Sequence, residues 1–210
     1  HLVERLAGRY DPVARAIPAD APVAARFDLL ALANERTDKL LAAFSDMPGA
    51  EDAGSVDEVI SRLDESLNKE LGLTFTDDIK PWLGQYAGLA ITEVPLPGTN
   101  EGRVPGGRAA GLAIESDPLG VKFALVVETR DQAKSDAFVK KLVDGAEKDS
   151  GKPATTTSYE GVTLYALESK SGEMLVVVTR SGDVVVLGND VKAVQKVIDT
   201  QAGRAAPLAD

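Results

Sequence analysis

The chain of 210 residues contains no cysteine and a single histidine, which is its first residue, His1. Without cysteine there are no thiol nucleophiles, thiolate metal sites or disulfides, and this absence fits either an exported or an intracellular protein. A lone terminal histidine is typical of a processing remnant, so no imidazole is left as a general base at neutral pH. These absences exclude Ser-His-Asp catalysis and histidine-rich zinc sites.

Long apolar runs are also absent: no stretch approaches the roughly 18 consecutive apolar residues that cross a bilayer, and we expect no signal peptide within these residues. The chain does not begin with Met, so we expect a fragment or a mature ectodomain. The formal net charge of -10 disfavours nucleic acid and anionic lipid headgroups as partners. With 44% hydrophobic and 27% charged residues, the composition is that of a globular protein with a proper core.

The spacing of prolines and glycines predicts the domain organisation. Pro12, Pro18 and Pro22 mark residues 1–22 as a linker or wrapping arm. Residues 23–203 are expected to form a single α+β domain, and residues 204–210 a tail that leads into a missing C-terminal part. Within the domain, residues 95–107 ("PLPGTNEGRVPGG") have the composition of a long mobile loop without a phosphate-binding motif.

Hydrophobic periodicity predicts a mostly antiparallel sheet with helices packed on one of its faces. Expected strands cover residues 23–32, 86–94, 109–117, 121–129, 161–169, 173–181 and 183–189. Expected helices begin near Asn34, at the capping box formed by Ser55 and Glu58, at Asp131, and at Asn189 or Asp190.

Aromatic residues make up only 5% of the chain, and its one tryptophan lies in "TFTDDIKPWLGQYAGLAITEV", from Thr74 to Val94. Thr76 is the expected N-cap of a short turn, which Pro81 keeps brief. Trp82 is then expected to plug the entrance of the following strand, with its indole N–H bound to a carbonyl group or water. The alternative is a ligand-stacking role.

No constellation of polar residues predicts catalysis or metal binding. Asp77 and Asp78 fit the start of a helix, where acidic side chains are favourable. Lys134 with Ser135, and Lys170 with Ser171, are neighbours without the buried lysine that a Ser-Lys dyad needs. The acidic cluster Glu51, Asp52, Asp57 and Glu58 does not have the spacing of a calcium loop. Asp190 already caps its helix and would repel an anion at Asn189.

Four stretches resemble a bacterial family known as domain of unknown function thirty-three fifty-two: "IPADAPVAARFDL", "LGLTFTDDIKPWLGQYAGLAI", "ALVVETRDQAKSDAFVKKL" and the segment from "EGVTLYALES" to "KAVQKVID". The core "DIKPWLG", Asp78 to Gly84, is the most specific part. The resemblance implies an ectodomain that follows an N-terminal transmembrane helix in a longer protein, of which this chain is the first half. It supplies no catalytic residue.

We therefore expect a non-catalytic binding or scaffolding ectodomain on the extracytoplasmic face of a bacterial membrane, with no cofactor and no metal. The partner would be an envelope protein. The alternative is a small-ligand or lipid carrier with an apolar pocket between sheet and helices, near Trp82 and Tyr86. A third hypothesis, a hydrolase that uses carboxylates alone, requires two carboxyl groups about 5–10 Å apart in a cleft.

Overall fold

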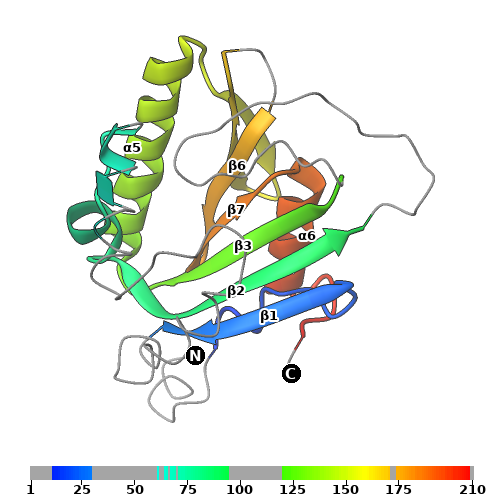
Figure 1. The fold of residues 1–210 in the computed structure, drawn as a ribbon. Helices are drawn as coiled ribbons and strands as arrows, with labels where there is room; N and C mark the ends of the chain where they lie inside the picture. Colours follow the sequence, from blue (N-terminus) through cyan, green and yellow to red (C-terminus); the bar gives the residue numbers. More distant parts are fainter. Residues whose placement is uncertain are drawn as a thin grey trace, which may run out of the picture.

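A seven-stranded sheet forms the centre of the molecule, in the order β1-β2-β3-β7-β6-β5-β4, and every neighbouring pair is antiparallel (Figure 1). The computed structural model describes residues 11–29, 61, 64–65, 67–69, 71–94, 120–170 and 174–208. The α+β class with an antiparallel sheet and helices packed against it is confirmed. The two expected helices that begin near Asn34 and Ser55 start outside the described residues, as do the acidic cluster at 51–58, the strand at 109–117 and the loop 95–107.

Most strands form where Val-rich or alternating segments predicted them. The strands are β1 (Val23–Asp28), β2 (Leu83–Glu93), β3 (Lys122–Thr129), β4 (Thr155–Tyr159), β5 (Val162–Glu168), β6 (Met174–Ser181) and β7 (Val184–Gly188). The strand β4 was not predicted, because its sequence TTTSY contains no aliphatic residue that marks a buried face.

The two long helices begin at the predicted caps. In α5 (Gln132–Ser150) the Asp131 side chain accepts a hydrogen bond from the Lys134 backbone N–H at 3.0 Å. Gly151 ends the helix in the left-handed region with φ 72°. In α6 (Val191–Gln201) the Asp190 side chain caps the first turn in the same way.

The helices do not share one face of the sheet, so this part of the prediction is wrong. Val184 and Val186 of β7 belong to the core that includes α6, whereas Val185 between them belongs to the core that includes α5. Successive side chains of a strand point to opposite faces. We call these surfaces the α6 face and the α5 face.

The α6 face is also covered by the N-terminal segment, residues 11–22, which passes behind β1 in Figure 1. Val13, Ala16 and Ile17 are fully buried there. Their close approach requires a glycine in β2, because a Cβ atom on Gly88 would lie 2.5 Å from Ile17 Cδ1 and 2.7 Å from Val13 Cγ1. The described part of the predicted arm is thus packed into the core.

The tail pairs with the same segment. Pro18 and Pro207 form an isolated antiparallel bridge. Ala19 donates its backbone N–H to the Ala206 carbonyl at 2.9 Å, and Leu208 donates to the Ile17 carbonyl at 2.8 Å. Residues near both described ends of the chain therefore lie side by side.

On the α5 face, a five-residue π-helix, η1 (Phe75–Ile79), leads into β2. Its N-cap is Thr74, whose hydroxyl accepts from the Asp77 N–H at 3.1 Å, so the prediction of Thr76 as the cap is wrong. Asp78 closes the turn from the other side by accepting the Thr74 N–H at 2.8 Å. The wider turn of the π-helix brings Trp82 back onto the sheet.

Candidate functional site

Trp82 is a structural plug, as the first of its two interpretations predicts. Its side chain is 2% exposed, and its indole N–H donates to the Asp78 carbonyl at 2.6 Å. The ring packs against Phe138 of α5 with 5.0 Å between ring centroids. A ring that is covered on all sides offers no stacking surface to a ligand in this conformation.

Tyr86 lies on the opposite face of the sheet from Trp82. It packs beside the α6 core, and the Arg26 guanidinium lies over its ring, 4.0 Å from the centroid. Arg26 is itself paired with Asp11 of the N-terminal segment. The structure therefore does not bring together the two residues proposed to line one ligand pocket.

A different hollow is present on the α5 face, where α5 crosses β5 and β6. This groove encloses about 670 Å³. Its walls come from three parts of the chain: Asp136, Val139, Lys140, Val143, Asp144 and Glu147 of α5; Gly161, Val162, Thr163 and Tyr165 at β5; and Arg180, Ser181 and Gly182 at the end of β6. Five of these thirteen residues carry ionisable acidic or basic groups, so the groove is mainly polar.

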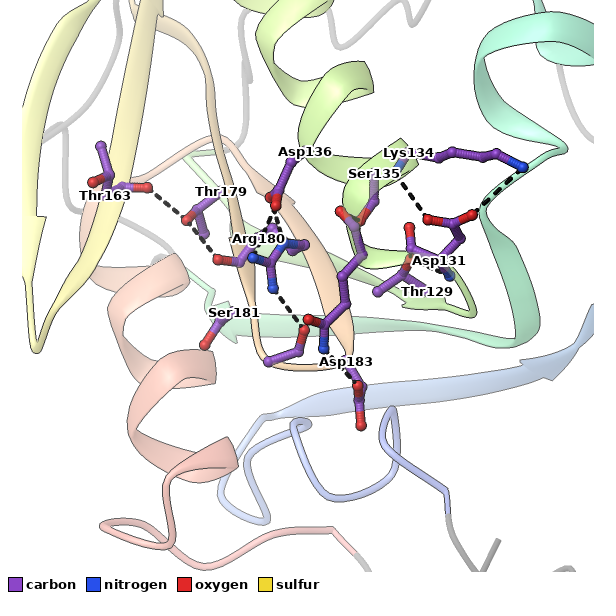
Figure 2. A network of polar contacts seen from close by, with 12 residues as sticks. Thr129, Asp131, Lys134, Ser135, Asp136, Thr163, Thr179, Arg180, Ser181 and Asp183 are labelled. Carbon is purple, nitrogen blue, oxygen red and sulfur yellow. Dashed lines mark hydrogen bonds and ion pairs between the residues drawn. The ribbon is translucent and has the colours of Figure 1, made fainter. Parts of the chain in front are cut away.

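Arg180 links α5 to the β6–β7 turn at one end of the groove (Figure 2). Its guanidinium forms an ion pair with Asp136 of α5, with Nη2 3.0 Å from Oδ2. Its Nη1 also donates to the Gly182 carbonyl at 2.9 Å, inside the β6–β7 turn. The Arg180 side chain is 23% exposed and that of Asp136 is 54% exposed, so the pair links α5 to the end of β6 at the protein surface.

The same end of the groove is braced by contacts around the start of α5. Gln132 donates from its side chain to Asp183 at 3.1 Å, which ties the first turn of the helix to the β6–β7 turn. The Asp131 pKa is lowered, mainly because its carboxylate accepts the Lys134 backbone N–H. Figure 2 shows the Arg180–Asp136 pair between α5 and the β6–β7 turn, and the Asp131–Lys134 contact apart from it at the start of α5.

Further along α5, Lys140 and Asp144 form an exposed pair, with Nζ 2.8 Å from Oδ2. Their hydrogen bond raises the pKa of Lys140, so the ammonium group stays charged at neutral pH. Glu147 accepts the Ala154 backbone N–H at 2.8 Å and thereby holds the segment that leads into β4. Charges of both signs thus line the helix side of the groove.

The other sequence candidates within the described residues have structural roles, whereas Ser171, and with it the Lys170–Ser171 pair, lies outside the described residues. Lys141 pairs with Asp78 at 2.8 Å, which joins α5 to η1. Ser135 is fully buried and donates its hydroxyl to the Gln132 carbonyl, while the Lys134 ammonium lies 3.4 Å from Asp131, so these neighbours form no Ser-Lys dyad. Asn189 binds β3, with Nδ2 2.7 Å from the Val121 carbonyl.

The described part of the chain contains neither a candidate metal site nor a candidate membrane span. Within residues 11–29, 61–94 and 120–208, less the gaps noted above, no group of three or more acidic, histidine or cysteine side chains is placed to hold a metal ion. No helix in those ranges is long and apolar enough to cross a membrane.

Residues 6–210 match the model of the family described as "Protein of unknown function (DUF3352)". Because the match spans nearly all of the sequence, the chain belongs to this family. No curated protein and no solved structure matches the chain.

Sequence reasoning missed the groove because its walls are far apart in the chain. The sequence "RSGD", between two expected strands, has the composition of a tight turn, and "DQAKSDAF" that of a helix start, so neither indicates a groove. Arg180 at the end of a Val-rich strand is the one sequence feature that indicates a contact here. Such a strand is buried, so a charged residue at its end needs a partner.

Proposed function

We propose that the chain is a non-catalytic binding or scaffolding domain that receives a polar segment of a partner protein in the groove between α5 and β5–β6. The observation that supports this is the charged lining of the groove, whose two walls are linked by the Arg180–Asp136 pair. Small-molecule pockets are lined predominantly by apolar and aromatic side chains. A mixed-charge surface with a tyrosine is closer to the composition of a protein interface, with its polar rim.

The groove offers specific contacts to an extended segment. Thr163 is exposed on β5 and its hydroxyl group can donate or accept a hydrogen bond. Tyr165, half-buried two residues along the same strand, adds an amphipathic ring. Lys140 and Asp144 on the opposite wall present one charge of each sign to side chains of a partner.

The alternative function, a carrier of a small ligand or lipid, requires an apolar pocket. The lining of the groove includes neither Trp82 nor Tyr86, and Arg180 and Asp136 stand in its wall. If the domain is a carrier, the polar lining favours a small polar ligand over a lipid. Binding of such a ligand is one outcome of the experiment below.

The experiment is site-specific photo-cross-linking of the full-length protein in its own cells. A photoreactive amino acid at Thr163 probes the groove, and one at Lys148, exposed elsewhere on α5, is the matched control. We expect a protein adduct of discrete mass from position 163 alone, and its loss when Lys140→Glu is added. The variant Lys148→Glu should leave the adduct unchanged. An adduct that forms equally from both positions, or from neither, contradicts the proposal; a small-molecule adduct from position 163 favours the carrier.

We also propose that the domain is held on the extracytoplasmic side of a bacterial membrane by a segment outside this chain. The support is the resemblance of "DIKPWLG" and its flanking stretches to a family of anchored ectodomains. Protease treatment of intact cells or spheroplasts tests this location. Degradation of the domain without lysis is expected, and protection until lysis contradicts the proposal.

A further inference from the structure

The strand β4 is an edge of the sheet that lacks the usual protection against pairing. Natural edge strands are blunted by charged residues, proline or bulges. The other edge, β1, carries Arg26 and Asp28. In contrast, β4 has the uncharged sequence TTTSY, and its register with β5 is continuous over all five residues. Thr155 to Ser158 are all exposed.

The hairpin turn determines which backbone groups of β4 point outward. Glu160 and Gly161 have φ 51° and 77°, the two positive values of a type I′ turn. The pair Tyr159–Val162 that closes this turn is therefore hydrogen-bonded, and pairs alternate along the ladder. Thr157 and Thr155 bond to β5, and the N–H and C=O groups of Thr156 and Ser158 point away from the sheet. Outside the β4–β5 ladder, no described residue hydrogen-bonds to these outward groups.

The outward groups have the symmetry of a two-fold interface. The outward groups belong to Thr156 and Ser158, which lie on either side of Thr157. A two-fold rotation about an axis at Thr157 places Ser158 of the second copy opposite Thr156 of the first. The same rotation places Thr156 of the second copy opposite Ser158 of the first. Each such antiparallel pair exchanges both of its hydrogen bonds. Thr157 then faces Thr157 of the second copy, and cross-strand threonine pairs are favourable. A patch that complements itself in this way is the requirement of an isologous dimer.

The charges around β4 favour a second copy in the antiparallel orientation. Lys152 precedes the strand. Glu160 follows it, with a side chain 52% exposed, beside Asp199 and Arg204. The two-fold rotation brings the lysine end of one copy toward the glutamate end of the other. The strand itself carries none of the net charge of -10, so repulsion at the axis is small.

We propose that β4 pairs with β4 of a second copy of this chain, which extends one sheet across a symmetric homodimer. A single strand pair buries less area than the roughly 1,200–2,000 Å² of a stable interface, so the dimer is weak and depends on concentration. The proposal concerns the outer edge of the sheet and does not rest on the function proposed for the groove.

The absence of cysteine allows a direct test, because a single introduced cysteine can form a disulfide only with its counterpart in another copy. Non-hydrogen-bonded antiparallel pairs have Cα atoms about 4.5 Å apart, within the range of a disulfide. Thr157→Cys is therefore expected to form a covalent dimer under mild oxidation. Thr155→Cys is the matched control on the same exposed strand. The two-fold rotation places its counterpart four residues along, well beyond disulfide reach.

We expect Thr157→Cys to cross-link at least about tenfold faster than Thr155→Cys, in keeping with the distance limit for a disulfide. Adding Thr156→Pro removes an outward N–H without removing a bond to β5, and should abolish the difference. Thr157→Lys in the otherwise natural chain places like charges at the axis and should reduce dimer formation in sedimentation equilibrium. Equal cross-linking at residues 155 and 157 overturns the proposal, as does a concentration-dependent dimer that Thr157→Lys leaves unchanged.

Discussion

The two faces of the sheet are covered in different ways, although the same strands supply both. On the α6 face, α6 and the N-terminal segment meet over the centre of the sheet, and Val13, Ala16 and Ile17 are fully buried. On the α5 face, α5 contacts mainly β5, β6 and η1, and leaves the groove open at its side. One face is a packed core, whereas the other combines a core with an accessible surface.

This difference shows where the fold can accept change. The α6 face is closed by segments from the two described ends of the chain, so a change there should affect the stability of the whole domain. The α5 face has a well-packed end around Trp82 and Phe138 and a polar end around Arg180. Substitutions at the polar end should affect binding more than stability.

The largest effect is expected for Trp82→Ala, at the packed end of the α5 face. The substitution leaves a large cavity against Phe138 and removes the donor to the Asp78 carbonyl. The free energy of unfolding should fall by about 3–5 kcal/mol, as for other buried aromatic residues. Urea denaturation followed by circular dichroism measures this. The control Thr163→Ala, in the groove, should change stability by less than about 0.5 kcal/mol. Equal losses of unfolding free energy in the two variants would show that the packed end and the polar end of the α5 face contribute equally to stability.

On the α6 face, Ile17→Ala should reduce the free energy of unfolding by about 2–5 kcal/mol, because a fully buried isoleucine leaves a cavity. Val23→Ala is the control, since Val23 is 51% exposed only a few residues further along the chain. If Ile17→Ala were as mild as Val23→Ala, the N-terminal segment would not be part of the core in solution. Chemical denaturation of both variants under identical conditions gives the comparison.

The tight packing of this face is tested by Gly88→Ala. A methyl group there would lie 2.5 Å from Ile17 Cδ1, so the variant should lose about 1–3 kcal/mol through overpacking. Ile17→Val removes that Cδ1 atom. The double variant should therefore be more stable than the sum of the single losses predicts, with a coupling of about 0.5–3 kcal/mol. Additive losses in thermal and urea unfolding would mean that the two residues do not touch.

The smallest effect concerns the start of α5 and depends on pH. Because the pKa of Asp131 is lowered in the folded state, its ionised form contributes stability above the pKa of 3.8 that it has when unfolded. This contribution is lost as the pH falls through the lower, folded pKa. The difference in unfolding free energy between the natural protein and Asp131→Asn should thus shrink between pH 6 and about pH 3. Urea titrations at several pH values measure it, and a difference that is constant with pH contradicts this role.

The local structure could largely be predicted from the sequence. Asp131 and Asp190 were identified as caps because an acidic residue before an apolar periodic segment satisfies the free N–H groups of the first turn. A glycine after a helical segment is typical of a helix end, and Gly151 has the positive φ that this end requires. Each of these features depends on residues within a few positions of one another.

The arrangement of the two faces was missed, although one signal was available. The run Val184, Val185 and Val186 does not alternate with polar residues, and a strand without alternation is buried on both sides. Helices on both faces follow from that. The groove could not be predicted, because Asp136 and Arg180 meet only through the order of β5, β6 and β7. Trp82 was selected as the one tryptophan, but neither its rarity nor its nearness to Tyr86 in the sequence determines the face on which each lies.

The bridge between Pro18 and Pro207 has a consequence for how the domain bears mechanical load. The paired segments are antiparallel, and the Leu208–Ile17 hydrogen bond lies at one end of the pairing. Residue 11 and residue 208 are both reached from that end. Tension applied between residues 11 and 208 would open these bonds one after another, as in a zipper, rather than shear them together. The N-terminal segment would then be drawn from the α6 face before any strand of the sheet is loaded. The bridge would therefore open first, and removal of Val13, Ala16 and Ile17 from the α6 face would then destabilise the rest of the domain.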